Sequence, residues 1–365
     1  MNNYNFIVIF GCAYALSENK KFVNPALLIL AEIIPGFLTQ LLYPQILYKI
    51  PYLYRIITLY IIQILSSVFL MINPENLFFL FSGIILVSIN SYLGESSLLS
   101  LSSFYDKKEL RFWSIGTGFA GLMGTGLFLI FNLWLTERVI FAINLFLYLL
   151  GMSVGLYLID FQNKIKQNQQ ISEVNEDTTE SVSQVQLDDF DSRNEENLVQ
   201  KEGKYSILKR NFKFFIEIYP IILAYFFAYL FAFGYIPSLV ENNLNYQITQ
   251  FITRTSLFLG RTVGNYIHVE RVGLFGLIHL YNIALLVLFT ITIITQVSIH
   301  FLIVNLLFLP GYFINGLSYP MVYQYIYITY TDEKEWYMGA VGQYTSFLTI
   351  LGCAIGYPLQ LTWRK

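Results

Sequence analysis

Long apolar runs repeat along most of this chain and constrain its fold more than any other feature. A helix needs about 20 mostly apolar residues to cross a bilayer, because its backbone polar groups must be satisfied inside the segment. Ten runs of this kind cover residues 24–46, 51–72, 77–103, 113–134, 137–160, 213–237, 246–263, 272–297, 299–328 and 337–362. The shorter stretch from Phe6 to Leu16 is interpreted as the second half of a further, incomplete span. We therefore expect an all-α polytopic membrane protein with about eleven transmembrane helices.

Composition supports the same class. Of the 365 residues, 55% are hydrophobic and only 13% are charged, about half the charged fraction of a soluble domain. The net charge of −2 gives no reason to expect a nucleic-acid partner. Three histidines and two cysteines are scattered without ligand spacing, so we expect no metal site, no cofactor and no disulfide framework. The expected partner is the lipid bilayer.

Residues 161–212 interrupt the apolar pattern. They include ten acidic residues and little apolar surface, a composition typical of a disordered segment. The segment divides the chain into an N-terminal bundle (1–160) and a C-terminal bundle (213–365), as a central loop does in two-half transporters.

The distribution of Lys and Arg predicts the orientation. If the N-terminus is cytosolic, eleven crossings put most basic residues in cytosolic segments, as the positive-inside rule requires. The linker would then be cytosolic and the C-terminus would lie on the opposite side. The residues on the cytosolic side would be Lys49, Lys107, Lys108, Arg111, Arg261, Arg271, Lys334 and those flanking the linker, against Lys20, Lys21, Arg138, Arg364 and Lys365 on the other.

Three apolar runs carry polar residues at helical spacing. The stripes are Glu32, Gly36, Thr39 and Gln40; Ser88, Ser91, Glu95 and Ser102; and Gln247, Gln250, Arg254 and Arg261. Such residues either join helices by hydrogen bonds or line a bundle interior or water-filled path. We favour the path for Glu95, Arg254 and Arg261 and the joining role for most serines. Glu32, Gln40 and Ser91 are further candidates for the path.

Small residues recur along residues 116–125. One row holds Gly116, Ala120 and Gly124, and a second holds Thr117, Gly121 and Thr125, with Gly118 beside them. Small residues let another helix backbone approach closely. The face either packs tightly and statically, or slides as one half moves over the other during alternating access.

A short motif lies at the end of the linker. Tyr205-Ser206-Ile207-Leu208 has the Tyr-x-x-apolar form that cytosolic sorting adaptors recognise. Tyr205 and Leu208 are therefore candidates for a sorting signal, although such patterns also arise by chance and Leu208 can simply begin a helix.

Several short motifs follow one another in residues 91–125. They are Leu93-Gly94-Glu95, Leu99-Ser100-Leu101 and Phe104-Tyr105, and then the segment from Trp113 to Gly124. In order and spacing they resemble the LGE…LSL…FY run and the WSSGTGGAGLLG block of the battenin (CLN3) family. Weaker similarities extend over nearly the whole chain. Among them, Arg261 and Tyr319 match family residues, whereas Gln40, Arg254 and Ala228 replace a Lys, a Gln and an acidic residue.

The resemblance implies a fold like the major facilitator superfamily, in a lysosomal or vacuolar membrane. It also implies efflux of small polar solutes, glycerophosphodiesters or basic amino acids, and a part in organelle pH homeostasis. It makes Tyr319 a further substrate-path candidate. The three departures affect the expected substrate rather than the fold.

Three hypotheses about function follow. The leading one is a secondary transporter in which Glu95, and Glu32 as a second candidate, take up protons while Arg254 and Arg261 attract an anionic group. The second is a non-transporting scaffold that recruits trafficking or pH-regulating partners through residues 161–212. The third, a lipid-modifying enzyme, ranks lowest because the sequence shows no catalytic constellation. The expectation is that the chain is not an enzyme.

Overall fold

The computed structural model describes residues 4–18, 23, 25–103, 107–151, 153–154, 156–157, 204–240, 242–267, 275–330 and 334–363. These residues form helices and connecting turns, and contain no β-strand. They fall into two compact units, Met1–Leu149 with Glu217–Lys365, and Leu150–Ile216. The prediction of an all-α polytopic protein is confirmed, and both predicted bundles contribute to the first unit.

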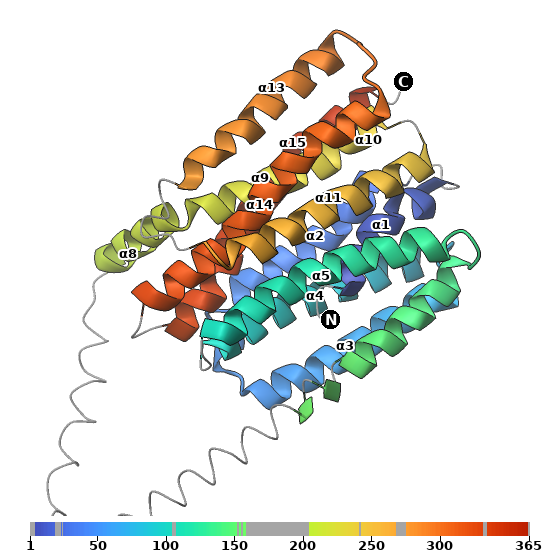
Figure 1. Ribbon diagram of the computed structural model, residues 1–365. Helices are drawn as coiled ribbons and strands as arrows, with labels where there is room; N and C mark the ends of the chain where they lie inside the picture. Colours follow the sequence, from blue (N-terminus) through green and yellow to red (C-terminus); the bar gives the residue numbers. More distant parts are fainter. Residues whose placement is uncertain are drawn as a thin grey trace, which may run out of the picture. The chain divides into compact units, whose positions relative to one another are not determined.

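The first unit is built almost entirely of long helices (Figure 1). They are α1 (Tyr4–Glu18), α2 (Pro25–Leu42), α3 (Tyr52–Ile72), α4 (Leu77–Ser102), α5 (Lys107–Phe131), α9 (Tyr219–Leu230), α11 (Asn243–Gly264), α13 (Leu280–Ile294), α14 (Phe301–Thr329) and α15 (Lys334–Trp363). Residues 137–149 are also helical. Shorter elements are η1 (Leu47–Lys49), the π-helical η2 (Phe231–Tyr235), α10 (Ile236–Leu239) and η3 (Gly276–His279).

Seven helices of the described chain are long and apolar enough to cross a membrane. They begin at Tyr52, Leu77, Lys108, Tyr219, Gly276, Phe301 and Lys334, close to seven of the predicted starts. The other four predicted spans coincide with α1, α2, residues 137–149 and α11. Helices α1 and α2 are shorter, and α11 carries polar residues along a buried face. The count of about eleven therefore stays a prediction.

Asparagine caps fix where two important helices begin. Asn76 accepts a hydrogen bond from the backbone N of Phe78 at 2.9 Å and starts α4. Asn242 does the same for Asn245 at 2.8 Å and starts α11. Such caps satisfy backbone N–H groups that have no partner inside the helix. They set the register of the two helices that carry Glu95 and both candidate arginines.

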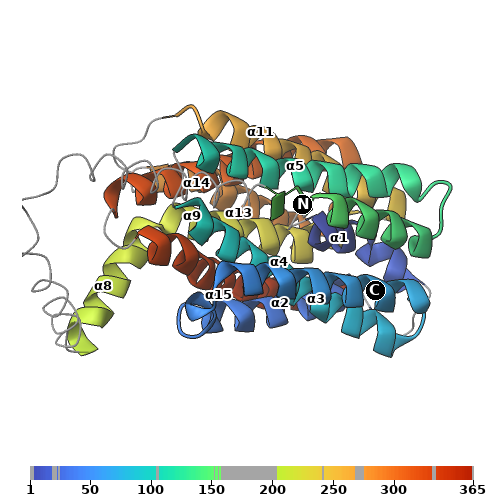
Figure 2. The same ribbon diagram turned by 90° about the horizontal axis from the view of Figure 1, so that it is seen from below.

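Helix α11 lies between α5 and α14, and α15 lies against α2, α4 and α9 (Figures 1 and 2). Glycines permit the closest of these contacts. A Cβ at Gly260 of α11 would lie 2.2 Å from the carbonyl oxygen of Phe313 and 3.0 Å from the Cα of Gly316. Only glycine fits there, so α11 is fixed directly against the backbone of α14.

The second unit contains α8 (Lys204–Glu217), which runs to the first residue of the other unit. Helix α8 begins inside the segment 161–212 that we predict to be a disordered linker. Residues 204–212 are therefore helical, in a stretch where apolar residues alternate with lysines and arginine. Residues 161–203 lie outside the described part of the chain. So do Lys20, Lys21 and Phe104-Tyr105.

Candidate functional site

A small cavity lies inside the first unit, between helices of both sequence halves. Its volume is about 70 Å³, room for a few water molecules. Side chains from α1, α4, α5, α9, α11 and α14 form its wall: Phe6, Ile7, Ser91, Tyr92, Glu95, Thr117, Gly121, Ala224, Tyr225, Ala228, Tyr229, Arg254, Leu257, Arg261, Asn315 and Tyr319. Five predicted path residues, Ser91, Glu95, Arg254, Arg261 and Tyr319, meet here. To reach 300 Å³, the lower end of the usual size of small-molecule sites, the cavity would have to expand about fourfold.

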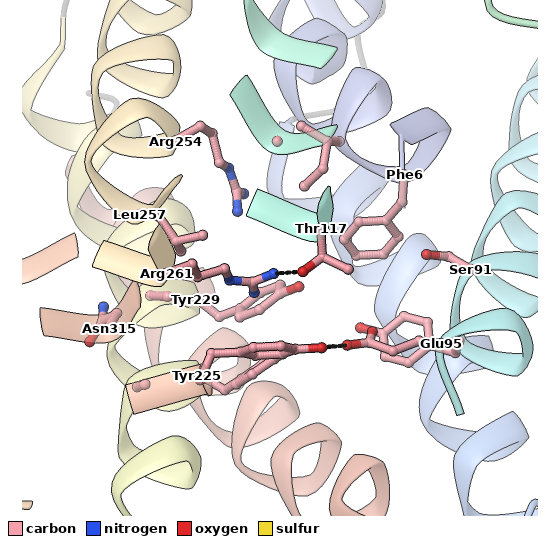
Figure 3. Close-up of a pocket in the computed structure, with 16 residues that line it drawn as sticks. Phe6, Ser91, Glu95, Thr117, Tyr225, Tyr229, Arg254, Leu257, Arg261 and Asn315 are labelled. Carbon is pink, nitrogen blue, oxygen red and sulfur yellow. Dashed lines mark hydrogen bonds between the residues drawn. The ribbon is translucent and has the colours of Figure 1, made fainter. Parts of the chain in front are cut away.

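Two arginines from α11 form one side of the cavity (Figure 3). The guanidinium of Arg261 donates through Nη1 to the hydroxyl of Thr117 and lies 3.9 Å from the ring centroid of Tyr319. The guanidinium of Arg254 lies 4.8 Å from the ring centroid of Phe10. The Nε atoms of both arginines are buried and have no hydrogen-bond partner among the described residues. This wall therefore holds two cations with unused donor capacity.

Glu95 faces the arginines from α4, with Ser91 one turn away (Figure 3). Its Oε1 accepts from the hydroxyl of Tyr319 at 3.2 Å and from the hydroxyl of Tyr225 at 3.5 Å. Tyr319 in turn accepts from the indole N–H of Trp113 at 3.2 Å. Tyr319 thus connects the acid of α4 with the cation of α11, through its hydroxyl and its ring.

Glu32 and Gln40, the two other predicted path residues, do not line the cavity. Glu32 is fully buried, and neither carboxyl oxygen has a hydrogen-bond partner in the described structure. The side chain of Gln40 instead accepts a hydrogen bond from Ser346 of α15 and covers Gly342.

The small residues of α5 make room for several neighbours. A Cβ at Gly118 would lie 3.1 Å from Cδ of Arg261, and one at Gly121 would lie 3.7 Å from Cδ of Arg254. One at Gly124 would lie 3.1 Å from a side-chain carbon of Ile7 in α1. Ala120 is also buried. Gly116 differs, because a Cβ there would meet no heavy atom within 4 Å, so a side chain at this position would have open space.

A second polar cluster, which we name the α15 seam, joins α15 to the ends of α2, α3 and α4. It consists of Gln40, Tyr43, Tyr52, Arg55, Ser100, Glu335 and Ser346. The hydroxyl of Tyr43 accepts from Nη1 of Arg55 at 2.7 Å and donates to Ser100 at 2.9 Å. Tyr52 donates to Glu335, and Ser100 donates to the Glu335 carbonyl at 3.2 Å.

Some site residues were not recognised from the sequence. Tyr225 and Tyr229 lie one turn apart on α9, and Asn315 lies one turn before Tyr319 on α14. That spacing was an available signal. The spacing did not stand out in the sequence, because the chain has 28 tyrosines and 32 phenylalanines. Aromatic residues at helical spacing are therefore too common here to single out one helix.

This fold and this cavity define the class of the protein. It is a multi-pass helical membrane protein with a cavity among its helices that charged side chains line. The model of the family described as CLN3 protein matches residues 1–363. This chain belongs to the CLN3 protein family. "Protein BTN1" of Kluyveromyces lactis is 28% identical over 375 residues, covering 99% of this chain and 91% of that protein. "Battenin" of Canis lupus familiaris is 25% identical, covering 93% of this chain and 83% of that protein.

Among solved structures, the Escherichia coli fucose:proton symporter aligns over 100% of this chain and 95% of that one. It is 13% identical, with a TM-score of 0.43, a likeness too distant to bear on function.

Proposed function

We propose that this protein is a secondary transporter that binds a small polar solute in the cavity between Glu95 and the two arginines. The observation that carries the proposal is the composition of the two walls. Glu95, Ser91 and Thr117 come from the N-terminal half, whereas Arg254, Arg261 and Tyr319 come from the C-terminal half. A ligand held between them therefore contacts both halves at once, as alternating access requires.

The arginines define the chemistry of the ligand. Two guanidinium groups favour an oxyanion, which they can bind through paired hydrogen bonds. A glycerophosphodiester carries such a group and is the preferred substrate class in our proposal. Because about 70 Å³ is too small for it, the cavity must widen when the solute enters.

Glu95 supplies the proposed coupling to protons. As a carboxylate it accepts hydrogen bonds from Tyr225 and Tyr319. Protonation removes its charge and turns one acceptor position into a donor, which weakens its bond to Tyr319. Since Tyr319 also lies under Arg261, proton uptake would loosen the connection between α4, α11 and α14.

The location that fits this proposal is a lysosomal or vacuolar membrane, with protons drawn from an acidic lumen. Tyr205 and Leu208, the predicted sorting residues, lie in α8. Recognition by a cytosolic adaptor, and the part in organelle pH homeostasis, belong to the same proposal. If Tyr205→Ala leaves the protein in the same organelle at the same level, that motif is not the address.

Flux out of proteoliposomes with an acidic lumen tests the proposal. Purified protein should carry glycerophosphodiesters, and Arg261→Ala should reduce their flux far more than that of lysine or arginine. The opposite ranking would favour basic amino acids as the substrate. Absence of flux for every solute, together with loss of function in cells when residues 161–203 are deleted, would favour the scaffold instead.

A further inference from the structure

Four buried polar side chains lead from η3 to the wall of the cavity. They are His279, Asn282, Asn315 and Ser318, and each is less than 5% exposed. The ring of His279 stacks on Phe227 of α9 at a centroid distance of 6.1 Å. Nε2 of His279 lies 3.0 Å from the Ser318 hydroxyl, and Nδ1 lies 3.1 Å from Nδ2 of Asn282. Of these four residues, only Asn315 lines the cavity.

The direction of these hydrogen bonds follows from one backbone carbonyl. The Ser318 hydroxyl donates its single proton to the carbonyl of Ile314 at 3.1 Å, so towards His279 it can only accept. The hydrogen bond from Ser318 to Ile314 thus assigns the ring proton of a neutral His279 to Nε2 and leaves Nδ1 as an acceptor. The backbone carbonyl of Pro220 is a further acceptor for the ring of His279. Nδ1 accordingly receives a proton from Nδ2 of Asn282.

The chain of hydrogen bonds continues from Asn282 to Asn315 at the cavity wall. Nδ2 of Asn282 has a second proton, and it donates to Oδ1 of Asn315 at 2.9 Å. Because Oδ1 of Asn315 accepts this hydrogen bond and faces Asn282, the amide nitrogen of Asn315 points away from Asn282. That nitrogen is buried and has no hydrogen-bond partner in the described part of the chain. An unused buried donor is costly unless a ligand or water satisfies it.

We infer that Asn315 is a ligand-binding residue that offers its amide nitrogen as a third donor beside Arg254 and Arg261, and that His279 is the positioning residue that fixes its direction. The three residues lie on the side of the cavity built by α11 and α14, and each carries an N–H donor without a partner among the described residues that suits an oxygen atom of a phosphodiester. This inference rests on the proposed function and deepens it, because it assigns the oxyanion to the C-terminal half.

Ligand-observed NMR titration of the purified full chain in nanodiscs tests this assignment. The probe is dimethyl phosphate, the smallest phosphodiester, and methylammonium serves as the cationic comparison. Asn315→Asp keeps the shape but replaces the donor by an acceptor. It should weaken dimethyl phosphate binding at least about tenfold, as expected when a hydrogen bond to a charged group is lost, and leave methylammonium unchanged or tighter. Asn315→Leu should weaken the same probe without adding charge.

Asn305→Asp is the matched control. Asn305 is equally buried on α14, but it donates to the carbonyl of Phe301 and does not line the cavity. The control should leave dimethyl phosphate affinity unchanged. Equal losses in Asn315→Asp and Asn305→Asp would overturn the inference, and so would a wild-type protein that does not bind dimethyl phosphate. Neither result would overturn transport itself, which the flux measurement decides separately.

Variants of His279 test the positioning role. His279→Phe keeps the stacking on Phe227 and removes the acceptor for Asn282, so it should weaken dimethyl phosphate binding several-fold. His279→Gln restores an amide oxygen for Asn282 and a donor for Ser318, and should recover most of the affinity. Equal affinities in both variants would overturn the positioning role, because mere packing would not distinguish an acceptor from a ring.

Discussion

The cavity and the α15 seam are both polar clusters that join the two sequence halves, yet they differ in how densely their side chains are packed. In the seam, the Tyr43 hydroxyl both donates and accepts, and a Cβ at Gly339 would lie 2.6 Å from the Ser100 hydroxyl. Both regions hold buried donors that have no hydrogen-bond partner among the described residues, Nε of Arg55 in the seam and donors of Arg254 and Asn315 in the cavity. In the cavity, however, a Cβ at Gly121 would meet only ordinary contacts. A dense, hydrogen-bonded cluster holds helices together, whereas space with unused donors can receive a ligand.

The largest effect on stability should come from disrupting the contact between α11 and α14, the helices that carry the two arginines and Asn315. In Gly260→Ala the new methyl group would overlap the backbone of α14, and neither backbone can move away alone. We expect destabilisation at or above the usual 1–3 kcal/mol of overpacking, seen as poor recovery and a lower thermal midpoint in detergent. Gly116→Ala is the control, since a Cβ there meets open space and stability should not fall. A normal midpoint for Gly260→Ala would mean that α11 is not held against α14 as described.

The next effect concerns the seam. Tyr43→Phe removes the hydroxyl that links Arg55 and Ser100. Leaving buried polar groups unpaired costs about 1–3 kcal/mol, so the thermal midpoint should fall. Solute KM in proteoliposomes should stay at the wild-type value, because the seam does not line the cavity. A large change in KM at unchanged stability would place the seam in the solute path and end the distinction between the two regions.

Helix α4 shows how far sequence alone could separate these regions. Its apolar length predicted the helix, and the rarity of an ionisable residue at that depth singled out Glu95, which lines the cavity. Ser91 and Ser100, by contrast, look alike in the sequence, yet Ser91 lines the cavity and Ser100 belongs to the seam. Their roles depend on which helix lies opposite, and neither hydropathy nor spacing specifies that partner.

Gln40 in the N-terminal half and Asn315 in the C-terminal half illustrate the same limit. Gln40 shares a stripe with Glu32 but contacts Ser346, 306 residues away along the chain. Asn315 owes its direction to His279 and Asn282. Local pattern predicts which face of a helix is polar, whereas these assignments require contacts between distant segments.

A smaller effect is expected at the cavity edge. Gly121→Leu would extend a side chain past Cδ of Arg254, which lies 3.7 Å from the position of the new Cβ. Arg254 can move away, so stability should change by about 1 kcal/mol or less. The solute KM should rise several-fold as the cavity fills, and Gly121→Ala should behave like wild type. Severe misfolding of Gly121→Leu would show that the contact between α5 and α11 is as tight as the seam.

The pH dependence of solute flux in Glu95→Gln tests the central claim most directly. Glu335→Gln is the matched control, because both carboxylates accept from a tyrosine hydroxyl, one in the cavity and one in the seam. Glu95→Gln retains the shape of the side chain and cannot exchange a proton. Our account predicts that flux becomes independent of lumenal pH in Glu95→Gln and keeps its wild-type pH dependence in Glu335→Gln. An unchanged pH dependence in Glu95→Gln would contradict the account and leave Glu95 as a structural contact between helices.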